Sequence, residues 1–284
     1  MTLVQRDPAL HAHLGRLARE ARIVVMAGLP GTGKSLVIHQ LAHRAVNEGR
    51  RVHLLQWDVA RPVFEASAAG RRYPVIDGVT QPMIRTAVGL WARRAIAQWQ
   101  RRCAGREHLL IGEAPLIGGR LIELARRRDD EAEPVLADAS CRFVVSVPSA
   151  AVRRHVEAER ERRASTPRHD REREDAPPHV LRELWNGVRA AADALGIVVA
   201  GGARSYDPDV YRRVYEAVLV DRHPEIVALD TILPTASMSV YDFSVPYTDI
   251  VPRDDEVDAL VRAAERVWPD GARLAAALEH WWAA

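Results

Sequence analysis

The chain has 284 residues, of which 48% are apolar, so it is long and apolar enough for one large α/β domain with a buried core. Its 40 basic and 38 acidic residues leave a formal net charge of only +2, which disfavours a nucleic-acid-binding surface. The chain has neither an apolar run near the roughly 20 residues of a membrane span nor an N-terminal export signal. We therefore expect a cytoplasmic protein without a membrane partner.

The pattern of apolar residues predicts strands that alternate with helices. Residues 22–27 form an apolar, β-branched run typical of a buried parallel strand. In chain order we expect helix 8–20, strand 22–27, helix 35–47, strand 52–57, helix 80–103, strand 108–111, helix 119–127, strand 142–147, a charged helix from Ser149, helix 180–195, strand 197–200 and helix 207–219. This alternation predicts a five-stranded parallel sheet with helices on both faces.

The pattern changes near residue 221. Residues 231–249 contain Pro, Ser and Tyr without a clear period, and two amphipathic helices follow, separated by Pro269 and Gly271. We predict a core over residues 1–220 and a C-terminal helical extension over residues 221–284. Its apolar faces are expected to pack on the core, with a homodimer contact as the alternative.

Cysteine and lysine are both rare in this chain. Cys103 and Cys141 are too few and too far apart for a disulfide framework or a zinc site, so we expect two ordinary buried residues. Lys34 is the single lysine among 40 basic residues, and all the others are arginine. The position that keeps a lysine is therefore informative, because lysine supplies a compact charge on a flexible stem.

That lysine belongs to a phosphate-binding (Walker A) pattern, G-x-x-x-x-G-K-[ST], which places a glycine-rich loop between a strand and a helix. The matching residues are Gly28, Leu29, Pro30, Gly31, Thr32, Gly33, Lys34 and Ser35. The glycines allow backbone N–H groups to converge on a phosphate, and the following helix adds the positive end of its dipole. Lys34 is expected at the β- and γ-phosphates of ATP, and the Ser35 hydroxyl at Mg²⁺.

Other positions indicate which class of P-loop protein this is. A GTPase needs an Asn-Lys-x-Asp motif, and no lysine outside the loop is present to form one. Asp58 follows the second predicted strand, where a carboxylate can accept a proton from an attacking hydroxyl. With Arg61 and Pro62 close behind it, this segment resembles P-loop kinases of the uridine kinase and phosphoribulokinase type. That resemblance implies that Asp58 is the base and that Arg61 binds substrate.

The third predicted strand leads to a second acidic residue. The resembling kinases have a Glu-Gly pair after an apolar run, and here the order is Gly112-Glu113. We expect Glu113 to hold Mg²⁺ through water or to orient substrate, with helix capping as the alternative. Gly118, Gly119 and Arg120 follow, and they form either an anion site or a plain turn.

The segment after the fourth predicted strand resembles the lid of nucleoside and nucleotide kinases. It is rich in arginine and glutamate, and residues 158–179 contain few apolar side chains, which suits a mobile closing element. Arg160 and Arg163 are the expected contacts to the transferring phosphate. A solvated helix with pairs four residues apart is the alternative.

Together these features predict a small-molecule kinase that uses Mg·ATP and a hydroxyl acceptor, such as a nucleoside, a sugar or another metabolite alcohol. Helix 80–103 is expected to line the acceptor site, with Arg85 and Arg93 as candidate contacts. Two alternatives remain open. One is a polynucleotide kinase of the same fold, and the other is an ATPase switch that responds to a protein partner.

Overall fold

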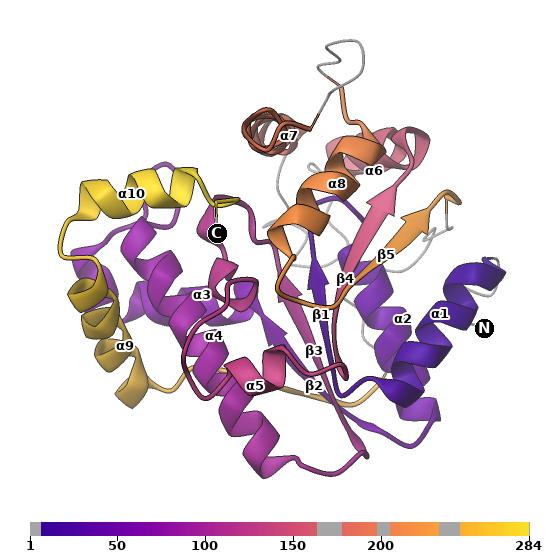
Figure 1. Ribbon diagram of the computed structural model, residues 1–284, viewed down its shortest axis with the longest axis horizontal. Helices are drawn as coiled ribbons and strands as arrows, with labels where there is room; N and C mark the ends of the chain where they lie inside the picture. Colours follow the sequence, from indigo (N-terminus) through magenta and orange to yellow (C-terminus); the bar gives the residue numbers. More distant parts are fainter. Residues whose placement is uncertain (1–6, 164–177, 198–204, 233–244, 284) are drawn as a thin grey trace.

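The computed structural model describes residues 7–163, 178–197, 205–232 and 245–283 (Figure 1). Its centre is a six-stranded, all-parallel sheet in the order β5-β4-β1-β3-β2-β6. The strands are β1 Ile23–Ala27, β2 Arg51–Gln56, β3 His108–Ala114, β4 Cys141–Pro148, β5 Pro224–Leu229 and β6 Tyr247–Asp249. Among the described residues, none of the helices combines the length and apolarity that a bilayer crossing requires.

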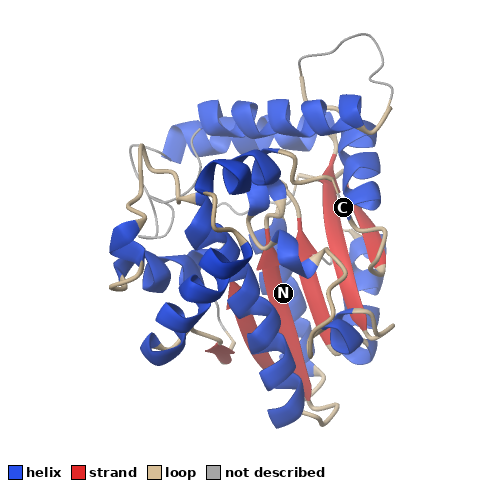
Figure 2. Cartoon of the chain, turned by 60° about the vertical axis from the view of Figure 1, so that its left-hand side comes forward, coloured by secondary structure: helices blue, strands red, loops and turns tan. Residues whose placement is uncertain are grey.

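Helices cover both faces of this sheet (Figure 2). They are α1 Pro8–Glu20, α2 Lys34–Asn47, α3 Trp57–Ala66, α4 Pro82–Arg102, α5 Glu133–Leu136, α6 Ala150–Arg163, α7 Pro178–Ala194, α8 Pro208–Val218, α9 Asp254–Val267 and α10 Gly271–Glu279. All five residues of β1 are buried, and its side chains alternate between two apolar clusters. One cluster includes side chains of α1 and α2, and the other includes side chains of α3, α4, α8, α9 and α10. The predicted α/β class is therefore confirmed.

The two predicted C-terminal helices pack on α4 and the turns beside it (Figure 1). The apolar face of α9, with Val257, Val261 and Ala264, is buried in the core cluster. Trp91 Nε1 on α4 donates a hydrogen bond to Glu256 Oε1 at 2.9 Å. On α10, Leu278 is only 4% exposed. Both apolar faces are thus covered by the rest of this chain.

The sheet differs from the prediction at its edges. The described residues form six strands rather than five, and both additional pairings use residues beyond 221, which the sequence predicts as a helical extension. In the predicted strand 197–200, Ile197 is not in a strand, and residues 198–200 lie outside the described part. The edge strand β5 has only two buried side chains among six residues, and β6 has only three residues. Neither produces the continuous apolar run that marks a central parallel strand.

The predicted helix over residues 119–127 is also wrong. Two short 3₁₀ turns, Ile117–Gly119 and Ile122–Leu124, take its place. Gly118, Gly119 and Leu121 have φ angles of 62°, 77° and 60°. Left-handed backbone at three such close positions cannot belong to an α-helix.

Glu133 on α5 neutralises two buried arginines in this region. Its Oε1 lies 2.7 Å from Arg222 Nη1, and its Oε2 lies 2.8 Å from Arg93 Nη2. The side chains of Arg222 and Arg93 are 0% and 2% exposed. Removing one partner of a buried ion pair costs roughly 3–5 kcal/mol. We expect Glu133→Gln to lower the free energy of unfolding in urea by about 3 kcal/mol.

Glu131→Gln is the matched control, because Glu131 pairs with Arg101 on the exposed surface and should contribute about 1 kcal/mol or less. Equal effects of the two variants would contradict the prediction. Burial raises the pKa of Glu133, but hydrogen bonds from Arg222 and Arg93 outweigh it and lower the pKa from 4.5 to about 2. The stabilisation is therefore complete above pH 4.5 and is lost as the pH falls towards 2. The difference between wild type and Glu133→Gln should shrink in that window.

Candidate functional site

The glycine-rich segment joins the central strand β1 to α2, as the sequence predicts. Gly28, Gly31 and Gly33 have φ angles of 137°, 74° and 83°, which L side chains rarely adopt. A Cβ atom on Gly28 would lie 2.2 Å from the hydroxyl of Tyr211. Gly33 is also the N-cap of α2, so no capping side chain covers the first amide groups of that helix. This loop presents positive backbone dipoles at a helix N-terminus, which suits an anion.

Two buried side chains that sequence reasoning did not assign to the loop hold it in shape. The Leu29 N–H donates to the Tyr211 hydroxyl at 3.1 Å, and Arg153 Nη1 donates to the Pro30 carbonyl at 2.8 Å. Arg153 is 2% exposed and is fixed in turn by Glu157 at 2.7 Å. Burial raises the pKa of Tyr211 to about 12, so its hydroxyl stays neutral. Because both residues lie more than 100 positions along the chain from the loop, local patterns gave no signal for them.

Lys34 is buried at the centre of the site, with 5% of its side chain exposed. Its Nζ donates to the Leu29 carbonyl at 2.8 Å and lies 3.6 Å from Glu113 Oε1. Burial lowers the pKa of Lys34, and the Glu113 carboxylate opposes that shift. The charge of Arg160 lowers the same pKa, whereas that of Asp58 raises it. Lys34 therefore interacts electrostatically with three other predicted site residues, namely Glu113, Arg160 and Asp58.

Glu113 lies inside β3, which extends three residues beyond the predicted strand 108–111. It stands opposite Met26 on β1 and Gln56 on β2. Gln56 Nε2 donates to Glu113 Oε2 at 3.5 Å. Ser35, in the first turn of α2 beside Lys34, is half-buried. A carboxylate and a hydroxyl at this position are oxygen donors of the kind that Mg²⁺ takes together with water.

β2 ends at Gln56, one residue before the predicted end, and α3 begins at Trp57. Asp58 therefore lies in the first turn of α3, where it is exposed. The charge of Asp58 raises the pKa values of both Lys34 and Arg120 relative to burial alone. Burial lowers the pKa of Arg120, and the Asp58 carboxylate opposes that shift. Asp58 therefore stands within electrostatic range of two cations at the carboxyl ends of the strands.

Two arginines converge at Gly118. Arg85 on α4 donates to the Thr80 carbonyl at 2.7 Å and to the Gly118 carbonyl at 2.6 Å. A Cβ placed on Gly118 would lie 3.0 Å from Arg120 Nη1 and 3.5 Å from Arg85 Nη1. Burial, with the nearby charge of Arg120, lowers the pKa of Arg85 to about 10. Two guanidinium groups near one backbone position are the kind of arrangement that commonly binds a carboxylate or a phosphate.

The other predicted arginines differ in availability. Arg61 pairs with Glu65 at 2.9 Å, one turn further along α3. Arg93 is not an acceptor contact, because it is 1% exposed and its guanidinium is bound by Asp130 and Glu133. Arg160 is half-buried on α6. The side chain of Arg163 and residues 164–177 of the predicted lid lie outside the described residues.

Comparisons with protein-family models, with curated proteins and with solved structures found no match to this chain. The site combines a glycine-rich loop, a buried lysine beside a carboxylate, an exposed carboxylate and a pair of arginines.

Proposed function

We propose that this chain is an ATP-dependent phosphotransferase, which moves the γ-phosphate of Mg·ATP to a hydroxyl group of a small molecule. The observation that carries the proposal is the position of Lys34. Its Nζ is buried under the glycine-rich loop at the start of α2, and it lies 3.6 Å from Glu113. A loop of this geometry with a lysine and a hydroxyl directly after it is the phosphate-binding arrangement of P-loop proteins.

The order of the strands supports the same conclusion. In the sheet, β3 and β2 lie on one side of β1, and β4 and β5 lie on its other side. The chain therefore reverses its direction across the sheet after β3, when it passes β1 to reach β4. Ligands of open α/β sheets bind at such a point of reversal, outside the carboxyl ends of the strands. The loop after β1 and the segment after β3, which holds Gly118 and Arg120, follow the carboxyl ends of two neighbouring strands.

Each residue then has a defined task in the transfer. The loop amides and Lys34 hold the phosphates, and Arg160 and Arg163 stabilise charge on the phosphoryl group as it moves. Ser35 and Glu113 would hold Mg²⁺, which neutralises phosphate charge when bound. The acceptor oxygen forms a bond to the γ-phosphorus as the bond to the β-phosphate oxygen breaks. The acceptor proton passes to Asp58, and ADP leaves.

The arginine pair indicates the kind of acceptor. Arg85 and Arg120 are arranged around one backbone position, Gly118, and Arg120 lies within electrostatic range of the exposed Asp58. We infer that the acceptor carries a carboxylate or phosphate group, which these guanidiniums bind while Asp58 faces the hydroxyl. Arg61 pairs with Glu65. It lies one turn beyond Asp58 on α3, and its charge contributes to lowering the pKa of Arg120.

An acceptor screen tests this function. Protein with Mg·ATP labelled in the γ-phosphate is incubated with a low-mass metabolite extract, separated into anionic and neutral fractions. We expect label to enter a small molecule of the anionic fraction, with ADP release faster than without extract. ADP release that no fraction stimulates would contradict the proposal and favour an ATPase switch. Labelling of a polynucleotide hydroxyl in a parallel reaction, without small-molecule product, would favour the polynucleotide kinase.

A further inference from the structure

A second cluster of chemically reactive side chains lies at the opposite ends of β2 and β3 from the glycine-rich loop. It consists of His53, Cys103 and His108, whose donor atoms all lie within 4.8 Å of one another. His53 Nε2 and His108 Nδ1 are 3.0 Å apart. All three side chains are half-buried. Two imidazoles and a thiol are the side chains that zinc prefers in proteins.

The backbone around this cluster is held in place. His53 lies within β2, His108 begins β3, and Cys103 is the C-cap of α4. The Arg22 guanidinium donates hydrogen bonds to the carbonyls of Cys103, Gly105 and His108, the last at 3.0 Å. It also stacks on Trp99 at 4.9 Å. One side chain therefore fixes both ends of the loop that carries two of the three donors.

We propose that His53, Cys103 and His108 bind one Zn²⁺ ion, with its fourth coordination position open to the adjacent pocket. Zinc bonds nitrogen at about 2.0–2.1 Å, so two nitrogens of a tetrahedral site are about 3.3 Å apart. The observed 3.0 Å between the two imidazoles is close to that spacing. Three protein ligands with one open position are the arrangement of zinc sites that bind water or a substrate.

A direct hydrogen bond between His53 and His108 is the simpler explanation of the short distance, and two observations favour a metal. The third side chain of the cluster is the thiol of Cys103, which is itself a zinc ligand in many proteins. The other nitrogen of His108, Nε2, lies 3.5 Å from Glu107 Oε1, which is how carboxylates orient metal-binding histidines.

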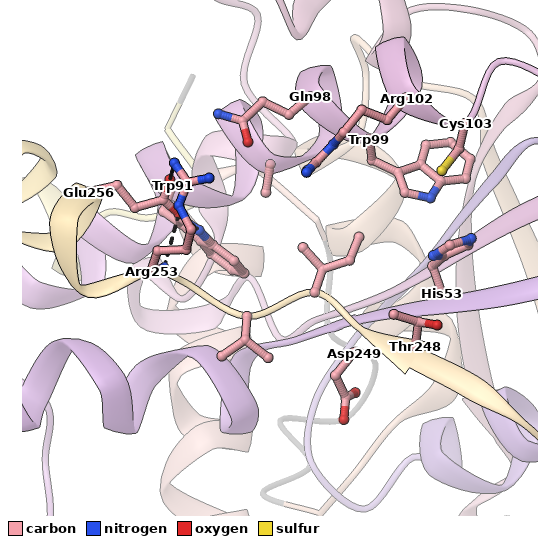
Figure 3. A pocket seen from close by; sticks show the side chains of 13 residues that line it. His53, Trp91, Gln98, Trp99, Arg102, Cys103, Thr248, Asp249, Arg253 and Glu256 are labelled. Atoms are coloured by element: carbon pink, nitrogen blue, oxygen red, sulfur yellow. Dashed lines mark hydrogen bonds and ion pairs between the residues drawn. The ribbon is translucent and has the colours of Figure 1, made fainter.

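The pocket beside the cluster has a volume of about 370 Å³. Figure 3 shows His53, Trp99 and Cys103 together at one end of this pocket, away from Arg253 and Glu256. Trp99 Nε1 has no hydrogen-bond partner within the described part of the chain, although the side chain is only 3% exposed. A water or a small anion on the zinc would give this buried N–H an acceptor. Arg102 lines the same pocket and favours an anion there.

Zinc titration tests the site in the full chain, prepared without a histidine tag, reduced and freed of metal. We expect one equivalent of Zn²⁺ to bind in competition with a chromophoric chelator. Co²⁺ should give the visible bands of a tetrahedral ion and a thiolate-to-cobalt charge-transfer band. Cys103→Ser should remove the charge-transfer band, and His108→Ala should remove stoichiometric binding. Glu107→Gln, which alters only a positioning residue, should weaken binding about 10- to 100-fold.

Two matched controls separate this site from adventitious binding. Cys141→Ser removes the other thiol, which is buried in β4, and His43→Ala removes an imidazole on α2. Both should bind like wild type. Zinc affinity unchanged in Cys103→Ser and His108→Ala, or a wild-type Co²⁺ spectrum without a thiolate band, would overturn the proposal. The wild-type spectrum decides the question even if a variant fails to fold, and none of these readouts depends on phosphoryl transfer.

Discussion

Replacing Lys34 by alanine is expected to reduce phosphoryl transfer by at least about 100-fold, the usual cost of removing one group that stabilises transition-state charge. It should also weaken ATP binding. No other lysine is present in the chain to take over, and the loop amides alone do not supply a full charge. Product formation with the acceptor found in the screen measures the first effect, and calorimetry with a non-hydrolysable ATP analogue measures the second.

Lys34→Arg separates charge from shape. The lysine amine is enclosed, with 5% of the side chain exposed and the Leu29 carbonyl 2.8 Å away. A planar guanidinium is larger and needs a different arrangement of acceptors. We expect this variant to be nearly as impaired as Lys34→Ala, and full activity would show that Lys34 does not contact the phosphates.

The single lysine also permits a test without turnover. An amine-reactive reagent can modify only Lys34 and the N-terminal amine. Mg·ATP should protect Lys34 from modification and leave the N-terminus as reactive as before, as peptide mass analysis would show. Lys34 that is labelled without Mg·ATP and labelled to the same extent with it would contradict its proposed position at the phosphates.

The parts of the fold that the sequence predicts well are those that local patterns determine. Helix α1 has the predicted bounds, and the segment from β1 through the glycine-rich loop into α2 lies as predicted. The parts it misses depend on partners far along the chain. The edge strand β5 is recognised only by its pairing with β4, and the Gly118–Leu121 turns replace a helix because their backbone is left-handed.

The same distinction applies to the two sites. Lys34 and Ser35 belong to one short motif, whereas Tyr211 and Arg153 reach the loop from α8 and α6 and have no motif of their own. Cys103 is predicted as an ordinary buried residue, yet it is half-buried and meets two histidines. One of them, His53, is 50 positions away, so ligand spacing along the sequence gives no zinc pattern. Only the parallel pairing of β2 with β3 brings His53 and His108 together.

Asp58→Asn is the sharpest test of the proposed chemistry. The exchange keeps the shape of an exposed side chain in the first turn of α3 and removes its charge and basicity. Loss of a general base costs about 10² to 10⁴ in rate, so we expect turnover to fall at least about 100-fold. ATP affinity should stay nearly unchanged, because the loop and Lys34 hold the phosphates.

Asp254→Asn is the matched control, because Asp254 is also an exposed acid in the first turn of a helix, α9. Both exchanges remove a favourable interaction with a helix N-terminus, worth about 0.3–1 kcal/mol, so their thermal midpoints should fall similarly while only Asp58→Asn loses turnover. Retained turnover in Asp58→Asn would exclude it as the base and make Glu113 the next candidate. A parallel loss of ATP binding would instead place the Asp58 carboxylate with the metal. The assignment of Asp58 as base therefore requires that turnover falls while ATP affinity is kept.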